Sequence, residues 1–162
     1  MTPKFRAWDK HGQKMFANDE LIIWNGNVYA NDSKKLTCNN LKGWSIDDEY
    51  LMLSTGIKDK AGNEIFEGDI LITNVHASIV SFGEYTYFED ADTEVTEVGF
   101  YLSYLNVSPA TYSPFEEFFW EKCQVIGNIH ENELDLIMYE AWKFNEELEH
   151  ENKNINGNNH QC

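Results

Sequence analysis

The stretch Thr55-Gly-Ile-Lys-Asp-Lys-Ala-Gly-Asn-Glu-Ile-Phe-Glu-Gly-Asp-Ile-Leu-Ile-Thr73 decides the fold of this chain. It holds three of the ten glycines, each where the chain has to turn. Glycine adopts positive φ angles without a Cβ clash, so the segment around Gly62 predicts a tight reversal between two strands. Gly68 predicts a second turn, which leads into the apolar run 70–72. The stretch therefore describes a β path, and it contains no catalytic signature.

Short strands are also predicted before this stretch. Apolar and aromatic side chains alternate at residues 5–8, and an apolar run occupies residues 21–24. The sequence Asn25-Gly26 is typical of a two-residue hairpin turn, so residues 28–30 should pair back onto the preceding strand. Residues 31–43 are polar and predict a loop. Another strand is expected at 51–54.

The second part of the chain predicts a further set of strands. Aromatic and β-branched residues favour strand structure, and an acidic loop interrupts them at residues 89–94. Gly83 is expected to break one strand, and Gly127 to mark a bulge in another. Ser113 followed by Pro114 is typical of a helix start and predicts a short helix to about Phe119. The predicted strands cover residues 70–75, 78–82, 95–105 and 124–129.

After Asn132 the apolar residues recur at steps of three and four, which predicts an amphipathic helix over residues 132–151. Its apolar stripe could dock on the chain's own core or mediate self-association, and both alternatives stay open. Residues 152–162 are rich in Asn and are expected to be disordered. The residues expected to mediate self-association are Leu134, Ile137, Ala141, Trp142, Phe144 and Leu148.

Charge is unevenly distributed along a chain whose formal net charge is −16. Residues 1–60 contain nine Lys and Arg against eight Asp and Glu, whereas residues 61–162 contain three against twenty. The second part therefore carries a charge of −17, which cannot attract a phosphate backbone, and no direct nucleic-acid binding is expected. Either the acidity keeps the protein soluble, or it presents a negative surface to a basic partner, by resembling DNA.

The cysteines and the hydropathy indicate a cytoplasmic protein. Cys38, Cys123 and Cys162 are irregularly spaced, which argues against a disulfide scaffold and a zinc site. No apolar run reaches the roughly 18 to 20 residues that a membrane helix needs. Residues 1–9 contain no apolar segment typical of a secretory signal. We therefore expect a cytoplasmic protein with no cofactor and no membrane association.

Three blocks of sequence occur in a characteristic order. They are "KFRAWDK" from Lys4, "TGIKDKAGNEIFEGDIL" from Thr55 and "QVIGNIHENELDL" from Gln124. Together they resemble the YopX-like proteins of bacteriophages and prophages, and they bracket residues 4–136. The residues that carry the resemblance are Phe5, Arg6, Trp8, Asp9, Thr55, Gly56, Asp59, Gly62, Glu67, Gly68, Asp69, Gly127 and Asn128.

The resemblance implies a fold and an origin but no mechanism, since the family has no established activity. The expected fold is mainly β with minor α. A β-rich segment over residues 1–55 would precede a small Src-homology-3-like β-barrel over 56–131, which is also the arrangement that the strand pattern suggests. The helix over 132–151 and the tail over 152–162 would follow.

Four carboxylates lie close together in the deciding stretch: Asp59, Glu64, Glu67 and Asp69. Hard cations bind several oxygen ligands, so these side chains could converge on a metal ion. We prefer the interpretation that Asp59 and Asp69 shape turns while Glu64 and Glu67 face solvent, because turns use Asp and Gly for their own hydrogen bonds. No metal site is therefore predicted.

Three classes of function stay open. The leading one is a non-catalytic phage accessory protein that binds protein, as a homo-oligomer and in contact with a basic host protein. The second is an acidic decoy that occupies the DNA-binding site of a host enzyme. The third is a metal-dependent enzyme that uses the carboxylates of residues 59–69. No catalytic residue is assigned, because nucleophile elbows, phosphate loops and dinucleotide fingerprints are absent from the sequence.

Overall fold

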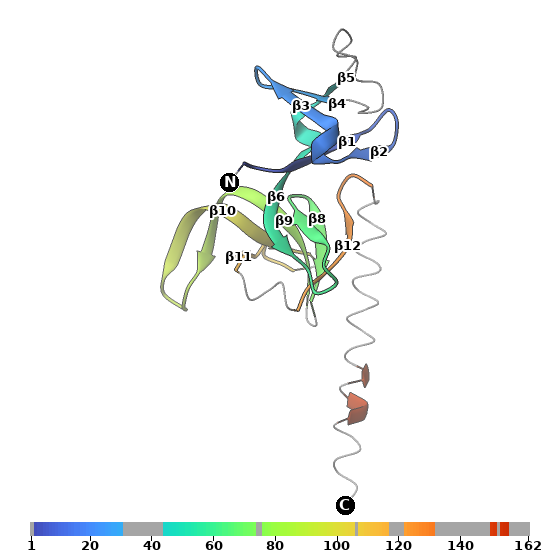
Figure 1. Ribbon diagram of the computed structural model, residues 1–162. Helices are drawn as coiled ribbons and strands as arrows, with labels where there is room; N and C mark the ends of the chain where they lie inside the picture. Colours follow the sequence, from blue (N-terminus) through green and yellow to red (C-terminus); the bar gives the residue numbers. More distant parts are fainter. Residues whose placement is uncertain are drawn as a thin grey trace, which may run out of the picture.

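The computed structural model describes residues 2–30, 44–73, 76–105, 107–116, 122–131, 150–151 and 153–155. This part of the chain is mainly β, as predicted (Figure 1). Two 3-10 turns, η1 (Asn18–Glu20) and η3 (Asp48–Tyr50), precede strands. The strands are β1 (Phe5–Asp9), β2 (Lys14–Phe16), β3 (Leu21–Trp24), β4 (Asn27–Ala30), β5 (Trp44–Ile46), β6 (Leu51–Lys58), β7 (Glu64–Phe66), β8 (Asp69–Ile72), β9 (Ala77–Phe88), β10 (Glu94–Tyr104), β11 (Tyr112–Pro114) and β12 (Gln124–Asn128).

The turns follow the predicted glycine chemistry. Asn25 and Gly26 have φ angles of 50° and 76°, and they form a two-residue turn because Trp24 pairs with Asn27. Gly62 and Gly68 have φ angles of 89° and 85°, and both lie in turns between strands, as predicted. These positions therefore fix where the chain reverses.

The first lobe combines strands from two sheets. One sheet has the order β3-β4-β5, and the other has the order β2-β1-β6-β7. Apolar side chains from both fill the space between them, because strands with one apolar face have to cover it. The buried residues of this core are Ala7, Phe16, Val28, Ala30 and Ile46.

The second lobe is a curled sheet with the order β11-β10-β9-β8-β12 (Figure 1). All of its neighbouring strands pair antiparallel, and β12 carries a bulge between Val125 and Gly127, where one was predicted. The core of this lobe also contains Ile65 from β7 and the thiol of Cys123, which is fully buried. Burial raises the pKa of the Cys123 thiol, which is typical of an inert structural cysteine.

One strand, β6, belongs to both lobes. Its first half, Leu51 to Leu53, pairs with β1, whereas Ser54 and Lys58 pair with β7 across a register shift. Figure 1 shows β6 running from the upper lobe into the lower one. The boundary expected between residues 55 and 56 falls inside this strand.

Two local predictions were wrong. Strand β9 continues through Gly83, which pairs with Gly99 of β10, because two facing glycines let both strands continue together. Ser113 and Pro114 belong to β11 and pair with β10, so no helix begins there. Proline can occupy this place because β11 is an edge strand, where a missing N–H breaks no ladder bond.

Several predictions fall on residues outside the described ranges, including the loop at 31–43 and the helix over 132–149. Residues 150–151 and 153–155 are helical, so helix is present at 153–155, where a disordered tail was expected from residue 152. Among the described residues, no helix is long and apolar enough to cross a membrane.

Candidate functional site

The residues that carry the family resemblance meet where the two lobes join. Arg6 of β1 forms an ion pair with Asp69, the first residue of β8. The guanidinium of Arg6 also lies 4.5 Å from the centre of the Phe66 ring, and its Nη2 is 3.6 Å from the sulfur of Met52. We call this group of residues the junction: Arg6, Met52, Phe66, Glu67, Gly68, Asp69 and His130.

Asp69 is the most buried charge of the junction. Its residue is 0% exposed, and its second carboxylate oxygen accepts a hydrogen bond from the N–H of Phe66 at 2.8 Å. Burial raises the pKa of Asp69, and the nearby charge of Arg6 acts in the opposite direction. Within the described part of the chain, the Nε of Arg6 is buried without a hydrogen-bond partner. Arg6 and Asp69 lie 63 positions apart in sequence. Their ion pair therefore forms only when the two lobes are correctly placed against each other.

Asp59 joins the deciding stretch to the last strand. Its Oδ1 accepts from the N–H groups of Ala61 and Asn63, at 2.9 and 2.8 Å, and closes the turn. Its Oδ2 accepts from the amide side chain of Asn63 at 3.2 Å and from the N–H of Val125 at 3.0 Å. Burial alone would raise the pKa of Asp59, but the hydrogen bonds from Val125 and Asn63 outweigh it and lower that pKa.

Asn128 connects the third sequence block, which begins at Gln124, to the second block, which begins at Thr55. This residue pairs with Asp69 in register, and its Oδ1 accepts from the N–H groups of His130 and Glu131 at 3.0 and 2.9 Å. The N–H of Ile129 donates to the carbonyl of Gly68 at 3.0 Å. Sequence alone places these blocks far apart, whereas the fold brings all three together.

The other motif residues make local structural contacts. Trp8 and Asp9 are buried, and Oδ1 of Asp9 accepts from the N–H of His11 at 3.0 Å. The hydroxyl of Thr55 donates to the carbonyl of Ile65 at 2.8 Å, and Gly56 has a φ angle of 74°. Phe5 and Gly127 take part in ladder pairs with β6 and β8.

The carboxylates considered as metal ligands have separate local tasks. Asp59 and Asp69 shape turns, as the preferred interpretation held. Glu64 and Glu67 were expected to face solvent, but both are half-buried: Glu64 accepts from the hydroxyl of Ser54 at 2.9 Å. The described residues contain no group of three or more His, Cys, Asp or Glu placed to hold a metal ion.

A cavity of about 280 Å³, which we call the junction pocket, opens beside the ion pair. Glu67 and Glu49 bring carboxylates to it, and burial raises the pKa of Glu67. His130 also lines the pocket. Burial and the charge of Arg6 lower the pKa of His130, which favours its neutral imidazole. Apolar wall comes from β9 and from Ile129. The pocket therefore has a mixed polar and apolar lining with an acidic component.

A second cavity, of about 460 Å³, lies on another side of Arg6. Lys4 and Arg6 line it together with Asp19 and Glu64, so its formal charges balance. It gives no strong preference for a ligand of either sign.

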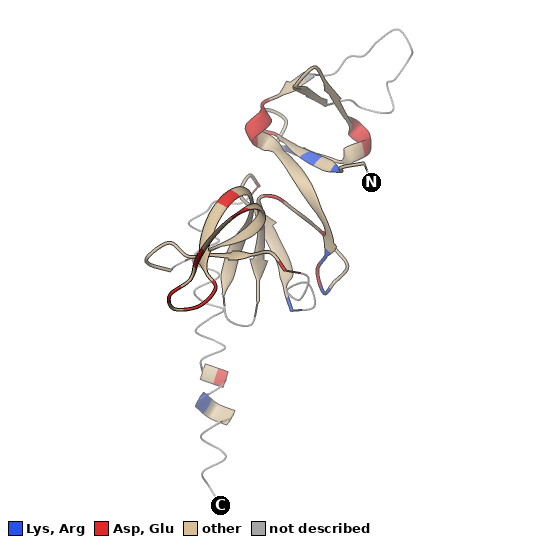
Figure 2. Cartoon of the chain, turned by 90° about the vertical axis from the view of Figure 1, so that its left-hand side faces the viewer, with Lys and Arg blue, Asp and Glu red and all other residues tan. Residues whose placement is uncertain are grey.

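The long antiparallel pair β9–β10, which we call the hairpin, extends from the second lobe (Figure 1). Its strands and turn, residues 77–104, contain six Asp and Glu and no Lys, Arg or His. Figure 2 shows acidic residues gathered on the loop at its tip and basic residues located mainly elsewhere. The hairpin therefore presents a negative surface.

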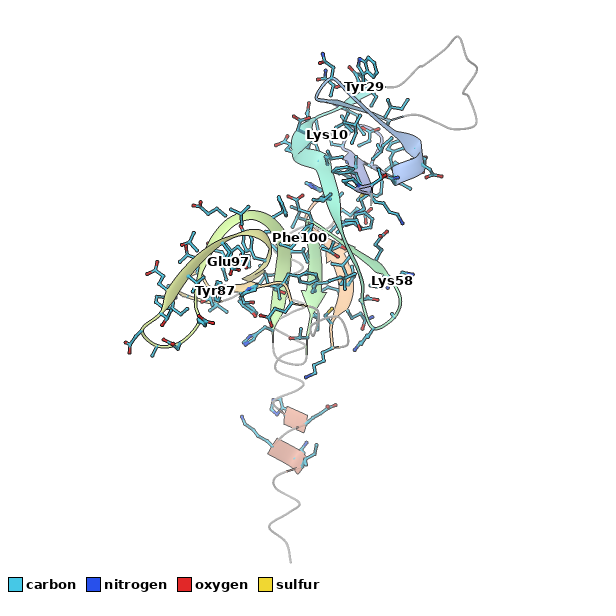
Figure 3. The ribbon with its side chains drawn as sticks, turned by 60° about the vertical axis from the view of Figure 1, so that its left-hand side comes forward. Lys10, Tyr29, Lys58, Tyr87, Glu97 and Phe100 are labelled. Carbon is cyan, nitrogen blue, oxygen red and sulfur yellow. The ribbon has the colours of Figure 1, made fainter. Side chains whose placement is uncertain are left out.

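One face of the hairpin is a row of tyrosines around a carboxylate. The rings of Tyr85 and Tyr101 stack at 4.8 Å, and those of Tyr85 and Tyr87 stack at 5.7 Å. The hydroxyl of Tyr85 donates to Glu97 at 3.0 Å (Figure 3 shows Glu97 beside Tyr87). Burial and the Glu97 carboxylate raise the pKa of Tyr85 to about 12. On this face Tyr85 is buried, Tyr87 and Tyr101 are half-buried, and Glu97 is exposed.

The opposite face of the hairpin exposes large apolar side chains. Phe82, Phe88 and Val98 are 48%, 68% and 72% exposed. The described residues leave Phe88 largely uncovered. The signal that could have identified this surface is the absence of any cation over residues 77–104, combined with apolar residues in alternate positions. The residues expected to mediate self-association, from Leu134 to Leu148, lie outside the described ranges.

Comparison with known proteins gives a family and similar solved structures. The model of the family described as YopX protein matches residues 4–136. Among solved structures, the chain resembles the crystal structure of protein EF1440 from Enterococcus faecalis, with 25% sequence identity and a TM-score of 0.44. That match covers 82% of this chain and 96% of the other. Comparison with curated proteins gave no match.

Proposed function

The chain belongs to the YopX family, and we propose that it is a non-catalytic phage or prophage protein that acts by binding another protein. The observation that carries this proposal is the hairpin, which combines six acidic residues with exposed Phe82, Phe88 and Val98. Exposed apolar side chains grouped on one surface are typical of protein interaction sites. The acidic residues beside them favour a partner with positive charge.

The contacts of the motif residues support a structural role for the motif. Arg6 and Asp59 use side-chain polar atoms in bonds that join one block to another, and Asn128 pairs with Asp69 in the ladder between β12 and β8. A motif of this kind holds the two lobes together and leaves the rest of the surface for binding. We include in the proposal that the second lobe is a Src-homology-3-like barrel, and that the protein works in the bacterial cytoplasm.

The proposal is tested by affinity capture with two variants of equal charge change. Asp92→Lys/Glu94→Lys alters the exposed hairpin tip, whereas Asp19→Lys/Asp48→Lys alters exposed positions of the first lobe. The intact chain should retain one host protein in stoichiometric amount from cytoplasmic extract. The tip variant should retain at least tenfold less, and the control should behave as the intact chain. Equal loss in both variants, or no retained protein, would contradict the proposal.

The acidic decoy is a narrower alternative, favoured by the same charges. A decoy occupies the DNA site of its partner, so duplex DNA should displace the captured protein in proportion to its concentration. Capture that is insensitive to duplex DNA excludes this alternative and leaves protein binding in place.

Self-association through the apolar stripe after Asn132 remains our prediction from the sequence. Each Leu, Ile or Phe buried between subunits would contribute roughly 1.5 to 3 kcal/mol, and salt screens the repulsion between acidic subunits beyond about 8 Å. Light scattering should therefore give an oligomer for the intact chain, and Phe144→Glu should shift it to the monomer. A monomeric intact chain at micromolar concentration would refute the prediction.

A further inference from the structure

Building on the proposed function, we propose that the outer edge of β9 binds an extended, lysine- or arginine-bearing segment of a partner protein as an added strand. A cationic side chain of that segment would enter the junction pocket, against Glu67 and Glu49. The argument depends on three features: a free strand edge, a pocket at the end of that edge, and the sign of the surrounding charge.

The free edge follows from the pairing of β9 with its neighbours. Strand β8 pairs with residues Ala77 to Ile79 of β9. The carbonyl of Val80 then accepts a hydrogen bond from the N–H of Gly68 at 2.7 Å. Beyond Val80, the described residues place no strand beside β9 on this side. The backbone groups of a strand point alternately to its two sides. Since Val80 points away from β10, so do the N–H and C=O groups of Phe82, Glu84 and Thr86.

The other strand of the hairpin confirms this direction. Glu89 donates its N–H to the carbonyl of Thr93 at 2.9 Å, so residues at odd positions of β9 bond to β10. Thr86 and Thr96 then form a pair whose backbone groups face outward on opposite edges, while their hydroxyls lie 2.9 Å apart. An edge with unused backbone groups is the surface that strand addition requires.

The junction pocket lies where β8 leaves β9. Gly68, Val80 and Phe82 line it, so it adjoins the first outward-facing residue of the free edge. Its volume of about 280 Å³ is close to the lower end of the range of small-ligand sites, which suits one long side chain better than a whole ligand. An added strand along β9 would end beside this opening.

The carboxylate of Glu67 in the junction pocket favours a positively charged side chain on the partner segment. In the described residues, Glu67 makes no ion pair, and its carboxylate receives one long hydrogen bond, from the N–H of Leu53 at 3.4 Å. Lys and Arg place an apolar stem against walls such as Met52 and Ile129 while the charged end meets a carboxylate. Burial raises the pKa of Glu67, so a bound cation would lower it and gain from that change.

The exposed apolar side chains complete the surface. Phe82 and Glu84 lie two residues apart on one face of the hairpin, and Val98 faces Glu84 across the ladder, so apolar and acidic groups are neighbours there. Because successive residues of a strand point to opposite faces, a partner strand with an apolar and a basic residue two positions apart would match this face. A second copy of this chain would bring a net charge of −16 to this acidic edge, which disfavours it as the occupant.

The test measures binding of two synthetic peptides by fluorescence anisotropy, one repeating Lys-Thr-Val-Thr and one repeating Glu-Thr-Val-Thr, so that charged and apolar residues share one face of the strand. The intact chain should bind the lysine peptide at least tenfold more tightly. Thr86→Pro removes an outward N–H from the proposed edge, and the matched control Thr96→Pro removes one from the opposite edge. Both lose the same hydroxyl contact, and proline is tolerated where the N–H faces solvent. Only Thr86→Pro should weaken binding, by tenfold or more.

A second variant tests the pocket, and the outcomes separate this inference from the proposed function. Glu67→Gln should weaken binding of the lysine peptide about tenfold while leaving the hairpin edge intact. Equal effects of Thr86→Pro and Thr96→Pro, or no peptide preference, would overturn the inference. If Asp92→Lys/Glu94→Lys abolishes host-protein capture but Thr86→Pro does not, the inference fails and the proposed function stands. Dimers that Thr86→Pro abolishes would assign the edge to a second copy and also overturn it.

Discussion

Replacement of Arg6 by Met should lower the free energy of unfolding by about 3 to 5 kcal/mol, because it leaves a buried carboxylate without its cation. Asp69 is 0% exposed and starts β8, so its charge cannot reach water without separating the lobes. Met keeps an unbranched apolar stem like the aliphatic part of Arg, but it removes the guanidinium together with its contact with the Phe66 ring. Urea denaturation at pH 7 measures the change.

Two further variants control this prediction. Lys10→Met removes an exposed ion pair, in which Nζ lies 3.6 Å from Asp47, and should cost less than about 1 kcal/mol. The double variant Arg6→Met/Asp69→Leu removes both charges and should recover much of the loss, because no buried charge is left unpaired. If Arg6→Met is as mild as Lys10→Met, the junction does not hold the lobes together.

Replacement of Asp59 by Asn should lower the free energy of unfolding by about 2 to 4 kcal/mol at pH 7. Asn has the same shape, but its amide nitrogen cannot accept the hydrogen bonds that Oδ2 receives from Asn63 and Val125. The N–H of Val125 would then lose its partner at the start of β12. The exposed Asp48→Asn is the control and should change stability by less than about 0.5 kcal/mol.

The same variant changes the response to acid. The pKa of Asp59 is lower in the folded chain than its ordinary value of 3.8, so the unfolded chain takes up its proton first as the pH falls. The stabilisation is present above pH 3.8 and is lost as the pH falls through the folded pKa. Asp59→Asn lacks this group, so the difference from the intact chain should shrink with acidification. A constant difference down to pH 3 would contradict the assigned role of the carboxylate.

Local turn chemistry made much of the strand order predictable. Asn25-Gly26, Gly62 and Gly68 each require positive φ, and that requirement is readable from residue type alone. The continuation of β9 through Gly83 was harder to predict, because a glycine inside a strand usually weakens it. Its partner in the ladder, Gly99, lies sixteen residues later in the sequence. Ser113-Pro114 matched a helix start locally, but pairing with β10 decided its conformation.

The site was less predictable than the fold. Arg6, Asp59 and Asp69 were identified as motif residues, yet their partners lie at sequence separations that no local pattern encodes. The half-buried state of Glu67 depends on how the lobes meet, which is a property of the whole fold. The acidity of the hairpin was readable from composition, whereas its free edge required the register of β8 against β9.

Because both lobes share β6, their unfolding should be coupled. Both the ladder with β1 and the ladder with β7 run along this one strand, so fraying of either lobe removes support from the other. The lobes should therefore melt as one cooperative unit rather than in sequence. A fragment beginning at residue 56 would retain three residues of β6 and lose Arg6 altogether, so it would not reproduce the second lobe in its native state.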